Sequence, residues 1–573
     1  MTVHQPYSTW TRHPYFDEAT RHELAAIAAD HKEIEDRFYR CLAFGTGGLR
    51  GIIGAGTNRM NRYVVRHVTQ GLARYINTFG PAAMERGVVI ARDSRRFSEA
   101  FALEAALTLN ACGVRAYLWD DLRPTPMLSF AVRELGAMAG IVITASHNPP
   151  QYNGYKVYWE DGGQVPTDRA AAIQETIAAI TDITAIHPMA EEEARARDLL
   201  RPVPPSVDRL YYDQLLTLVG SAPADRQACR ILFTPLHGTG NIPVRTVLGE
   251  AGFQVGVVAE QAEPDGDFPT VSYPNPEEPD VFRLALARAE QEQPDVIMAT
   301  DPDADRLGVM VRDGHGRYLL LNGNQLGAIL VDYILASRTV GGSLPPNGAV
   351  IKTIATSNMV APLCREYGVA LMDVHTGFKF IGDKIKQFEQ SGSHTFLFGF
   401  EESYGYLGAT FVRDKDAVMA ALMVADAVAF HKGRGRTLFD ALEGLWERCG
   451  HFLEGLYNVT LPGKEGQERI SALMDQLRRQ PPVAFAGIPV ASTDDYATGT
   501  GRHNAAGETY DLPLEPANVL HYRFADGGFV MVRPSGTEPK LKLYCSMVGR
   551  SRREAEERLQ AVQADALRHM GLI

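Results

Sequence analysis

The sequence predicts an α/β fold with three similar βαβ-type domains, each built on a mixed sheet, and a C-terminal α+β domain. Three observations lead to this prediction. The chain has 573 residues. This is too long for a single hydrophobic core, because domains usually span ~100–200 residues. A strand–helix–strand pattern occurs three times, and each time a late strand runs into a polar motif. The last part of the chain instead places several strands between single helices, which is typical of an α+β domain.

An N-terminal extension and the first repeat fill the first part of the chain. In residues 1–43, apolar side chains recur at helical spacing over 20–38. The first repeat has expected strands at 88–90, 114–119 and 141–143 and a helix over 101–111. Short apolar runs that alternate with helix-period segments indicate βαβ units. We therefore expect a first domain over residues 1–205, which ends at a proline-rich joint.

The pattern restarts twice. The expected strands of these repeats are 231–233, 255–258, 295–299, 350–354, 369–372 and 395–398. The C-terminal part has expected strands at 455–461, 519–524, 528–532 and 540–548 and helices over 465–478 and 552–569. We expect domain boundaries that give units of 206–324, 325–450 and 451–573. Because the carboxyl ends of parallel strands form the ligand-binding edge of such sheets, the polar motifs should lie there.

Composition and charge narrow the functional class. The net charge of −12 argues against general binding to nucleic acid or anionic membranes. No apolar run reaches the ~18 residues that span a bilayer, and the N-terminus lacks a secretory signal pattern. The six cysteines are scattered without a CxxC pair, which favours a reducing cytoplasm over a zinc or disulfide framework. The sequence does not decide the oligomeric state.

The first motif is TASHNPP at residues 144–150, directly after an expected strand. A serine at the end of a buried strand is exposed and rigidly held, and His147 and Lys156 bring an acid or base within local reach of Ser146. The flanks lack GxSxG, which argues against the nucleophile elbow of an α/β-hydrolase. A plain strand-ending turn explains this segment equally well when it is taken alone.

The second motif is DPDADR at residues 301–306. Asp301, Asp303 and Asp305 alternate after a strand and can converge on one hard cation. An EF-hand is excluded because Arg306 and Arg312 occupy the positions that need Gly and Glu. Three close carboxylates without a cation would repel one another, so a solvated acidic turn is the weaker interpretation. Arg306 beside them is suited to a phosphate group.

Two later loops are weaker signals. In GFEESYG at 399–405, Glu401 and Ser403 alternate and could bind vicinal hydroxyls; adjacent acids point apart, which argues against a glycosidase pair. In RPSGTEPK at 533–540, an arginine, two hydroxyls and a glycine N–H form a possible phosphate nest. GxxxxGK[ST] is absent, so this is not a Walker P-loop. A polar surface loop is the alternative for both.

Three further segments remain candidates. Thr376, Gly377 and Lys379 follow a strand and open a helix, a suitable place for an oxyanion or a sugar. The glycine-rich segments 45–51 and 238–243 do not complete GxGxxG, so a dinucleotide site is not expected. Arg50, in the first of them, could still lie over a phosphate.

The order of these motifs resembles the α-D-phosphohexomutase superfamily. TASHNPP and DPDADR are specific together, GFEESYG and RPSGTEPK support them, and the match runs from about Gly45 to Tyr544. FGTGGLRG at residues 44–51 is most similar to the long phosphoglucomutase and phosphopentomutase branch. The resemblance implies four domains around a central cleft and a phosphoserine at position 146.

The resemblance also implies roles for individual residues. The Mg²⁺ ligands would be Ser146, Asp301, Asp303 and Asp305. The groups around the transferring phosphate would be Arg50, His147, Lys156 and Arg306, with either Lys156 or His147 as general acid/base. The sugar and its second phosphate would contact Glu401, Ser403, Arg533, Ser535, Gly536 and Thr537. Tyr404-Gly405 stands where short relatives have Gly-His, and Phe378 stands where glucose-specific relatives often have Trp, which leaves the sugar open.

The activity implied is interconversion of α-D-glucose 1-phosphate and glucose 6-phosphate through the phosphoserine, with glucose 1,6-bisphosphate as activator and intermediate. Phosphopentomutase, phosphomannomutase and glucose-1,6-bisphosphate synthase activities are alternatives within the superfamily. A metal-dependent sugar-phosphate phosphohydrolase is the alternative from another class, and it would release inorganic phosphate. A non-catalytic sugar-phosphate sensor is disfavoured because all four motifs are intact.

Overall fold

Four principal sheets organise the part of the chain described by the computed structural model, residues 4–45, 47–220, 225–461, 463–535 and 540–573. The chain divides into two compact units. The first consists of Met1–Asn322, Ile381–Gly392 and Ser403–Thr437, and the second of Gly323–Phe380, Ser393–Glu402 and Leu438–Ile573. The predicted fold class, three mixed α/β domains followed by a C-terminal domain of different topology, is confirmed.

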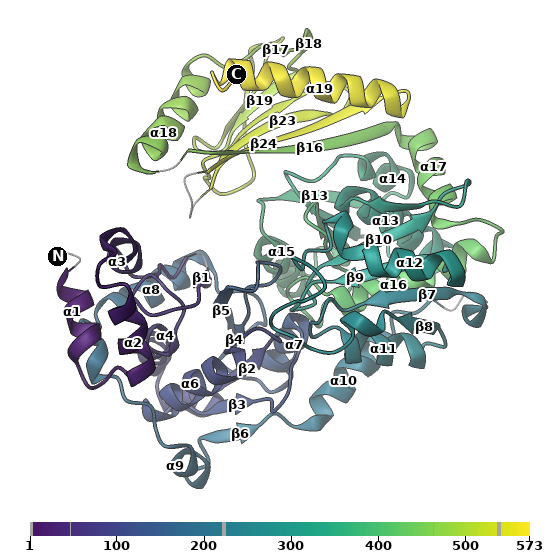
Figure 1. Ribbon diagram of the computed structural model, residues 1–573. Helices are drawn as coiled ribbons and strands as arrows, with labels where there is room; N and C mark the ends of the chain where they lie inside the picture. The colour runs from purple at the N-terminus through teal and green to yellow at the C-terminus, as the bar shows by residue number, and fades with distance from the viewer. Residues whose placement is uncertain (1–3, 46, 221–224, 462, 536–539) are drawn as a thin grey trace. The chain divides into compact units, whose positions relative to one another are not determined.

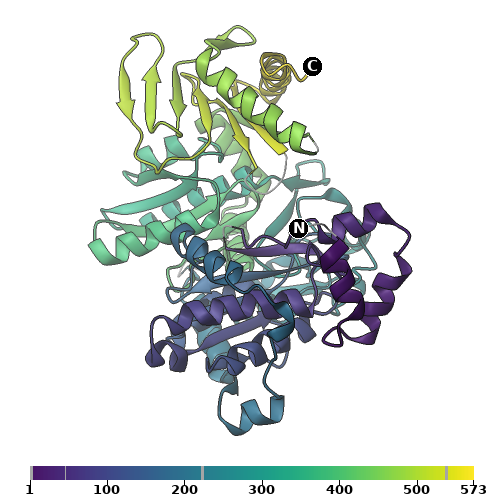
Figure 2. The ribbon, with the colours of Figure 1, turned by 90° about the vertical axis from the view of Figure 1, so that its left-hand side faces the viewer.

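Three short helices form the N-terminal extension: α1 (His4–Arg12), α2 (Glu18–Ala26) and α3 (His31–Phe38). The single helix expected over 20–38 is therefore wrong, because a turn interrupts it and the Asp30 carboxylate caps α3 by accepting from Glu33 N. Trp10, Phe16 and Phe38 bury their rings in one small core. Figure 2 shows these helices, in purple, gathered as a separate group within the first unit.

The first sheet has the strand order β1-β5-β4-β2-β3-β6. Its strands are β1 (Gly48–Ile52), β2 (Val88–Arg92), β3 (Ala116–Leu118), β4 (Ala139–Ile143), β5 (Tyr152–Trp159) and β6 (Leu200–Pro202). Its helices are α4 (Arg62–Asn77), α5 (Pro81–Arg86), α6 (Ser98–Ala111), α7 (Thr125–Glu134), α8 (Thr167–Ala178) and α9 (Glu191–Ala196). Apolar residues of α4, α6 and α8 share one core with the strands. Strand β5 runs antiparallel to both β1 and β4, and it was not predicted.

The second sheet has the order β11-β10-β9-β7-β8. Its strands are β7 (Arg230–Thr234), β8 (Gln254–Val257), β9 (Val296–Thr300), β10 (Leu307–Arg312) and β11 (Tyr318–Leu321). The helices of this region are α10 (Pro205–Leu216), α11 (Asn241–Glu250) and α12 (Arg283–Glu292). Strand β9 is parallel to β7 and antiparallel to β10. The DPDADR motif is the turn between β9 and β10. The first unit also contains β15 (Gly405–Leu407) and the apolar helix α16 (Ala417–Lys432).

The second unit begins with the third sheet, in which β12 lies parallel to both β13 and β14. Its elements are α13 (Gly323–Val340), β12 (Gly348–Thr353), α14 (Val360–Glu366), β13 (Ala370–Val374), β14 (Thr395–Glu401) and α17 (Leu438–Cys449), and α15 (Phe378–Ser391) follows β13. The candidate sugar contacts Thr376 and Gly377 follow β13, and Glu401 ends β14. They therefore lie at the carboxyl ends of these strands, as expected for such a sheet.

The C-terminal sheet is antiparallel, with the order β16-β24-β23-β22-β19-β20-β21. Its strands are β16 (His451–Thr460), β19 (Ser492–Asp495), β20 (Thr500–His503), β21 (Thr509–Asp511), β22 (Leu520–Arg523), β23 (Phe529–Pro534) and β24 (Lys540–Gly549), beside a small pair β17 (Ala484–Phe485) and β18 (Ile488–Pro489). Helices α18 (Gly463–Arg479) and α19 (Arg552–His569) cover one face and share its core (Figure 1). None of the described helices combines the length and the apolar character that crossing a bilayer requires.

Candidate active site

Ser146 lies in the loop that follows β4 and is 2% exposed. The expectation of an exposed serine is therefore wrong, because the aspartate loop packs against the hydroxyl. The Ser146 φ of +52° is in the left-handed region, which a serine adopts only when its surroundings require it. Ser146 N donates to Thr144 Oγ1 at 2.8 Å, and Ser146 Oγ donates to Asp301 Oδ2 at 2.8 Å. The structure thus joins the first two sequence motifs, which are 155 residues apart, through a direct hydrogen bond.

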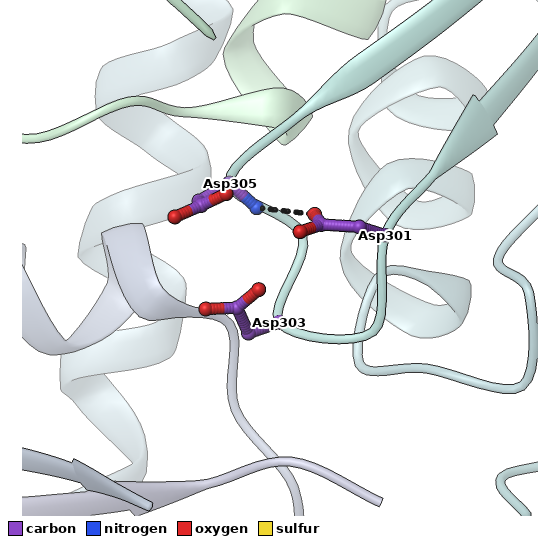
Figure 3. A group of neighbouring side chains, drawn as sticks. All are labelled: Asp301, Asp303 and Asp305. Carbon is purple, nitrogen blue, oxygen red and sulfur yellow. Dashed lines mark hydrogen bonds between the residues drawn. The ribbon is translucent and has the colours of Figure 1, made fainter. Parts of the chain in front are cut away.

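Asp301, Asp303 and Asp305 turn their carboxylates towards one another (Figure 3). One oxygen from each lies within 4.8 Å of the others, and all three residues are buried. The turn is held by Asp305 N and Arg306 N, which donate to Asp301 Oδ1 at 3.1 and 3.0 Å. The predicted convergence of the three carboxylates is therefore observed.

The glycine-rich segment after β7 supports this aspartate loop. Thr239 N donates to Pro302 O at 2.8 Å. A Cβ on Gly238 would lie 2.4 Å from Pro302 Cα, so only glycine allows the two backbones to approach this closely. The glycine-rich segment 238–243, which does not complete a dinucleotide motif, thus supports the aspartate loop through its backbone.

Two lysines form ion pairs with the carboxylates. Lys156 Nζ, on β5, lies 2.8 Å from Asp303 Oδ2 and 3.4 Å from Asp305 Oδ2. Lys415 Nζ lies 3.4 Å from Asp305 Oδ2. Burial would lower the pKa of Lys156, but Asp303 and Asp305 raise it above its ordinary value, so the lysine is protonated at neutral pH.

Because the carboxylates share one buried site, their pKa values are shifted. Burial and the charges of Asp303 and Asp305 raise the pKa of Asp301 well above its usual range. Burial would also raise the pKa of Asp305, but Lys415 and Lys156 lower it below the ordinary value. Bringing a divalent cation to the cluster would allow all three groups to ionise together.

The orphaned oxygens of the cluster test whether a metal ion fits. Asp303 Oδ1 and Asp305 Oδ1 are buried and have no hydrogen-bond partner among the residues described. A buried carboxylate oxygen without a partner is costly unless an ion or another polar group completes its environment. The all-oxygen donor set, with the Ser146 hydroxyl against Asp301, is suited to a hard divalent cation.

His147 places a ring nitrogen against the serine. Its Nδ1 lies 3.1 Å from Ser146 Oγ. Partial burial, with Arg306 and Arg50 nearby, lowers the pKa of His147 well below 6.5, so the ring is neutral at pH 7. The ring also stands edge-on to Tyr273, with centroids 5.8 Å apart. His147 is therefore able to accept a proton from a hydroxyl at this position.

Two arginines line the serine and aspartate loops. Arg306 Nη1 pairs with Glu277 Oε1 at 2.6 Å, and its Nε lies 3.9 Å from Asp305 Oδ1. Arg50, on β1, is exposed and donates to Asn148 Oδ1 at 2.8 Å. The structure thus brings together all five predicted catalytic residues: Arg50, Ser146, His147, Lys156 and Arg306.

The predicted substrate contacts are divided between the two units. In the second unit, Thr376 and Gly377 follow β13, Lys379 lies in the first turn of α15, and Glu401 ends β14. Ser403 belongs to the first unit.

Arg533 is the next-to-last residue of β23. Burial, Glu402 and Glu401 raise the pKa of Tyr544 on β24, and Arg533 opposes this shift. The acidic loop and Arg533 are thus neighbours of the same tyrosine within the second unit. Ser535 N donates to Lys540 O at 2.7 Å. Gly536 and Thr537 lie outside the described residues.

Sequence reasoning missed Lys415. It belongs to a run of four charged residues, Arg413 to Asp416, that precedes the most apolar helix of the chain. All four are buried. Tyr158 Oη donates to Asp414 Oδ2 at 2.7 Å, which ties this run to β5. A charged run that must be buried ahead of an apolar helix was the available signal.

Four domain families described for phosphoglucomutases and phosphomannomutases match the chain in order. Alpha/beta/alpha domain I matches residues 42–184, domain II matches 209–314, domain III matches 322–449, and the C-terminal domain matches 456–568. Together they match far more than half of the chain.

Individual relatives agree with this result. A phosphoglucomutase of Staphylococcus epidermidis is 38% identical over 517 residues, 90% of this chain and 92% of the relative. A phosphoglucomutase of Staphylococcus aureus (strain USA300) is 38% identical over 521 residues, 90% of this chain and 91% of the relative. The open-form crystal structure of parafusin, a phosphoglucomutase from Paramecium, has a TM-score of 0.68 at 18% identity and covers 93% of this chain and 96% of that one.

Proposed function

Because this chain belongs to the phosphoglucomutase/phosphomannomutase family, we propose that it interconverts α-D-glucose 1-phosphate and glucose 6-phosphate. One observation carries the proposal: the Ser146 hydroxyl donates to Asp301 of a buried aspartate triad. A serine in that position can carry a phosphate whose charge the site is built to offset. Relatives at 38% identity that are named phosphoglucomutases favour glucose over mannose or pentose phosphates.

The metal in this proposal is Mg²⁺, held by Asp301, Asp303 and Asp305 and by an oxygen on Ser146. When bound, it would supply positive charge to the equatorial oxygens of the transferring phosphoryl group. The bare oxygens of Asp303 and Asp305 support this assignment. Arg306 and Arg50 would offset the remaining charge of the phosphate, because guanidinium forks match phosphate oxygens.

Proton movement in the proposal is divided between His147 and Lys156. The neutral ring of His147 has its Nδ1 3.1 Å from Ser146 Oγ, so it can take a proton from a hydroxyl or return one to the serine. The Lys156 ammonium, held against Asp303 at 2.8 Å, is a donor and a fixed positive charge. This arrangement favours His147 as the base and Lys156 as an electrostatic partner.

The remaining residues would hold the substrate. We propose that the sugar and its non-reacting phosphate contact Thr376, Gly377, Lys379, Glu401, Ser403, Arg533, Ser535, Gly536 and Thr537. After the first transfer, glucose 1,6-bisphosphate would turn over and return its other phosphate to Ser146. Such a bisphosphate would also activate enzyme that has lost its phosphate.

The proposal includes four domains, bounded at 1–205, 206–324, 325–450 and 451–573. The order of the matched domain families supports these boundaries. We further propose a cytoplasmic location. The six free cysteines support it, because disulfides are rare in a reducing compartment.

The test is an isomerisation panel with the full chain. Glucose, mannose and ribose 1-phosphates are supplied with Mg²⁺ and a trace of glucose 1,6-bisphosphate, and both the product and inorganic phosphate are measured. We expect conversion of glucose 1-phosphate to be fastest, phosphate release to be negligible, and intact-mass analysis to show one phosphate on Ser146. Stoichiometric release of inorganic phosphate would instead identify a phosphohydrolase, and accumulation of the bisphosphate would identify a synthase.

A further inference from the structure

Arg95 is a buried arginine that holds the serine loop through backbone carbonyls. It is 3% exposed and follows β2. Its Nη1 donates to Pro149 O at 2.9 Å and to Tyr152 O at 3.0 Å. Its Nη2 donates to Ser146 O at 2.6 Å and to Asn148 O. One side chain thus satisfies four carbonyls of the loop that carries the reactive hydroxyl.

The arginine is itself fixed by a buried partner. Asp93 is 1% exposed, and its Oδ2 lies 3.3 Å from Arg95 Nε. Asp93 Oδ1 accepts from Arg95 N at 3.0 Å and from Ser98 Oγ at 2.8 Å. Thr144 links this pair to the serine, since its hydroxyl bonds to Asp93 and its Oγ1 accepts from Ser146 N. Arg95 Nε and Asp93 Oδ2 make no hydrogen bond with any described residue, so these two atoms interact through charge alone. The hydrogen bonds of the pair come from Asp93 Oδ1 and from the two Nη groups of Arg95. Removing one partner of a buried ion pair leaves the other charge uncompensated, which is strongly unfavourable.

The outer face of the Arg95 guanidinium packs on the second domain. Its Cζ lies 5.0 Å from the ring centroid of Phe268, which is fully buried. In the same segment, a Cβ on Gly266 would lie 2.6 Å from Arg96 N, so the two backbones meet without room for a side chain. Arginine is suited to both contacts, because a guanidinium stacks on an aromatic ring while its edge donates hydrogen bonds.

The segment that carries Phe268 also backs the aspartate loop. His237 Nδ1 lies 3.0 Å from Glu263 O, and its Nε2 lies 2.9 Å from Thr270 Oγ1. The glycine-rich turn that begins at His237 then holds the aspartate loop through Thr239 N and Pro302 O. The serine loop and the aspartate loop are therefore braced by the same stretch of chain, residues 263–270.

We propose that Arg95 is a positioning residue that sets the placement of Ser146 against Asp301. Fixing the Ser146 carbonyl and its neighbours stabilises the left-handed backbone of the serine, which would otherwise relax. The inference rests on the proposed phosphoryl transfer by Ser146, because only a reacting hydroxyl needs such placement. A misplacement of ~1 Å can lower turnover by about 10²-fold.

The experiment compares Arg95→Met, Arg95→Lys and Arg96→Gln in the full chain. Arg96 is a matched control: it is the next residue and pairs with Asp267 of the same segment, but it is exposed. Three quantities are measured: kcat and KM with glucose 1-phosphate, the thermal midpoint, and amide hydrogen exchange of residues 144–152 in the absence of substrate. Exchange reports how firmly the loop is held, whatever reaction the protein catalyses.

For Arg95→Met we expect kcat to fall by about 10²-fold, KM to stay within about threefold, and exchange in 144–152 to accelerate. Arg95→Lys should recover part of kcat, because the ammonium keeps donors but loses the planar fork. Arg96→Gln should match the wild type in all three measurements. Unchanged kcat and exchange in folded Arg95→Met would overturn the proposal, as would a change confined to KM.

If Arg95→Met fails to fold, Arg95→Lys and Phe268→Leu decide the matter. Both should show faster exchange in 144–152 and a lower kcat, and wild-type values in both would overturn the proposal. The exchange measurement also separates this inference from the proposed function. If the wild type isomerises no sugar phosphate, the proposed function fails, while accelerated exchange in Arg95→Met still establishes that Arg95 holds the loop.

Discussion

The two units of the chain hold their candidate site residues in different ways. In the first unit, Ser146, Asp301, Asp303 and Asp305 are buried and joined by direct hydrogen bonds and ion pairs. In the second unit, Thr376, Lys379 and Arg533 are partly exposed side chains at the ends of strands and at a helix start. Burial fixes geometry before a substrate arrives, whereas partly exposed groups can engage and release a ligand. We therefore expect the buried residues of the first unit to supply the chemistry and these three residues of the second unit to take part in recognition.

The largest expected effect tests the chemical role of the first unit. Ser146→Ala removes the proposed phosphate carrier, and we expect kcat to fall by roughly 10⁴-fold or more, as for other group-transfer nucleophiles. Intact-mass analysis should show no phosphate after incubation with glucose 1,6-bisphosphate. Binding of glucose 6-phosphate, measured by calorimetry, should remain. Activity near that of the wild type would remove Ser146 from the mechanism.

The next effect concerns the orphaned oxygens of the triad. Asp303→Asn removes one charge and replaces a carboxylate whose Oδ1 has no partner among the described residues with an amide, so affinity for a divalent cation should fall. We expect kcat to decrease by about 10²–10³-fold at limiting Mg²⁺, since a metal supplies several kcal/mol of charge stabilisation. Titration with Mg²⁺ after EDTA treatment measures the shift. An unchanged Mg²⁺ dependence would show that the triad binds no catalytic metal.

A smaller effect is expected in the second unit. Arg533→Ala removes the charged contact that we propose with the non-reacting phosphate, worth about 1.5–3 kcal/mol. We therefore expect KM for glucose 1-phosphate to rise by roughly 10–100-fold, with a much smaller change in kcat. Arg533→Lys, which keeps the charge, should lie between the variant and the wild type. A loss expressed in kcat alone would contradict the division between chemistry and recognition.

The same contrast explains what the sequence could reveal. The alternate spacing of Asp301, Asp303 and Asp305 after a buried strand predicted their convergence, because strand and turn geometry are local. Lys156 was suggested by proximity, yet strand β5 was missed, since its alternating polar and aromatic residues follow TASHNPP without a break. Within β5, Lys156 pairs with Val142 on β4 and with Gly48 on β1, and this register sets the face of the sheet on which the lysine lies. Such register depends on partners far away in sequence.

Lys415 and Arg95 could not be found in this way. Lys415 reaches Asp305 across 110 residues, and Arg95 reaches Ser146 across 51. Neither spacing carries a local signal. Arg95 and Ser146 meet because they follow β2 and β4, which are paired in one sheet although they are distant in sequence, and Lys415 reaches Asp305 from a segment outside the sheet that positions Asp305. The fold class and the motif loops were therefore predictable from periodicity and residue type, while the groups that support them required the three-dimensional structure.

Two buried ionisable groups away from the candidate site, one in each unit, have shifted pKa values with opposite consequences for stability. In the first unit, burial raises the pKa of Asp416 from 3.8 to about 6. In the second, burial, Arg523 and Lys352 lower the pKa of His521 well below 6.5. Asp416 contributes stability at low pH that is lost as pH rises towards 6 and above. His521 contributes stability above pH 6.5 that is lost as pH falls below it.

The smallest expected effect follows from Asp416, which accepts a hydrogen bond from Tyr211 Oη at 2.9 Å and caps α16. Asp416→Asn cannot ionise, so its free energy of unfolding should lack the loss that the wild type suffers between pH 4 and 7. A shift of about two pKa units corresponds to about 3 kcal/mol, and the variant should gain that much relative to the wild type across this range. Urea unfolding at several pH values, with probes in each unit, measures the difference. Because His521 lies in the other unit, the second transition should keep its wild-type pH dependence; a parallel change in both transitions would show that the two units unfold as one.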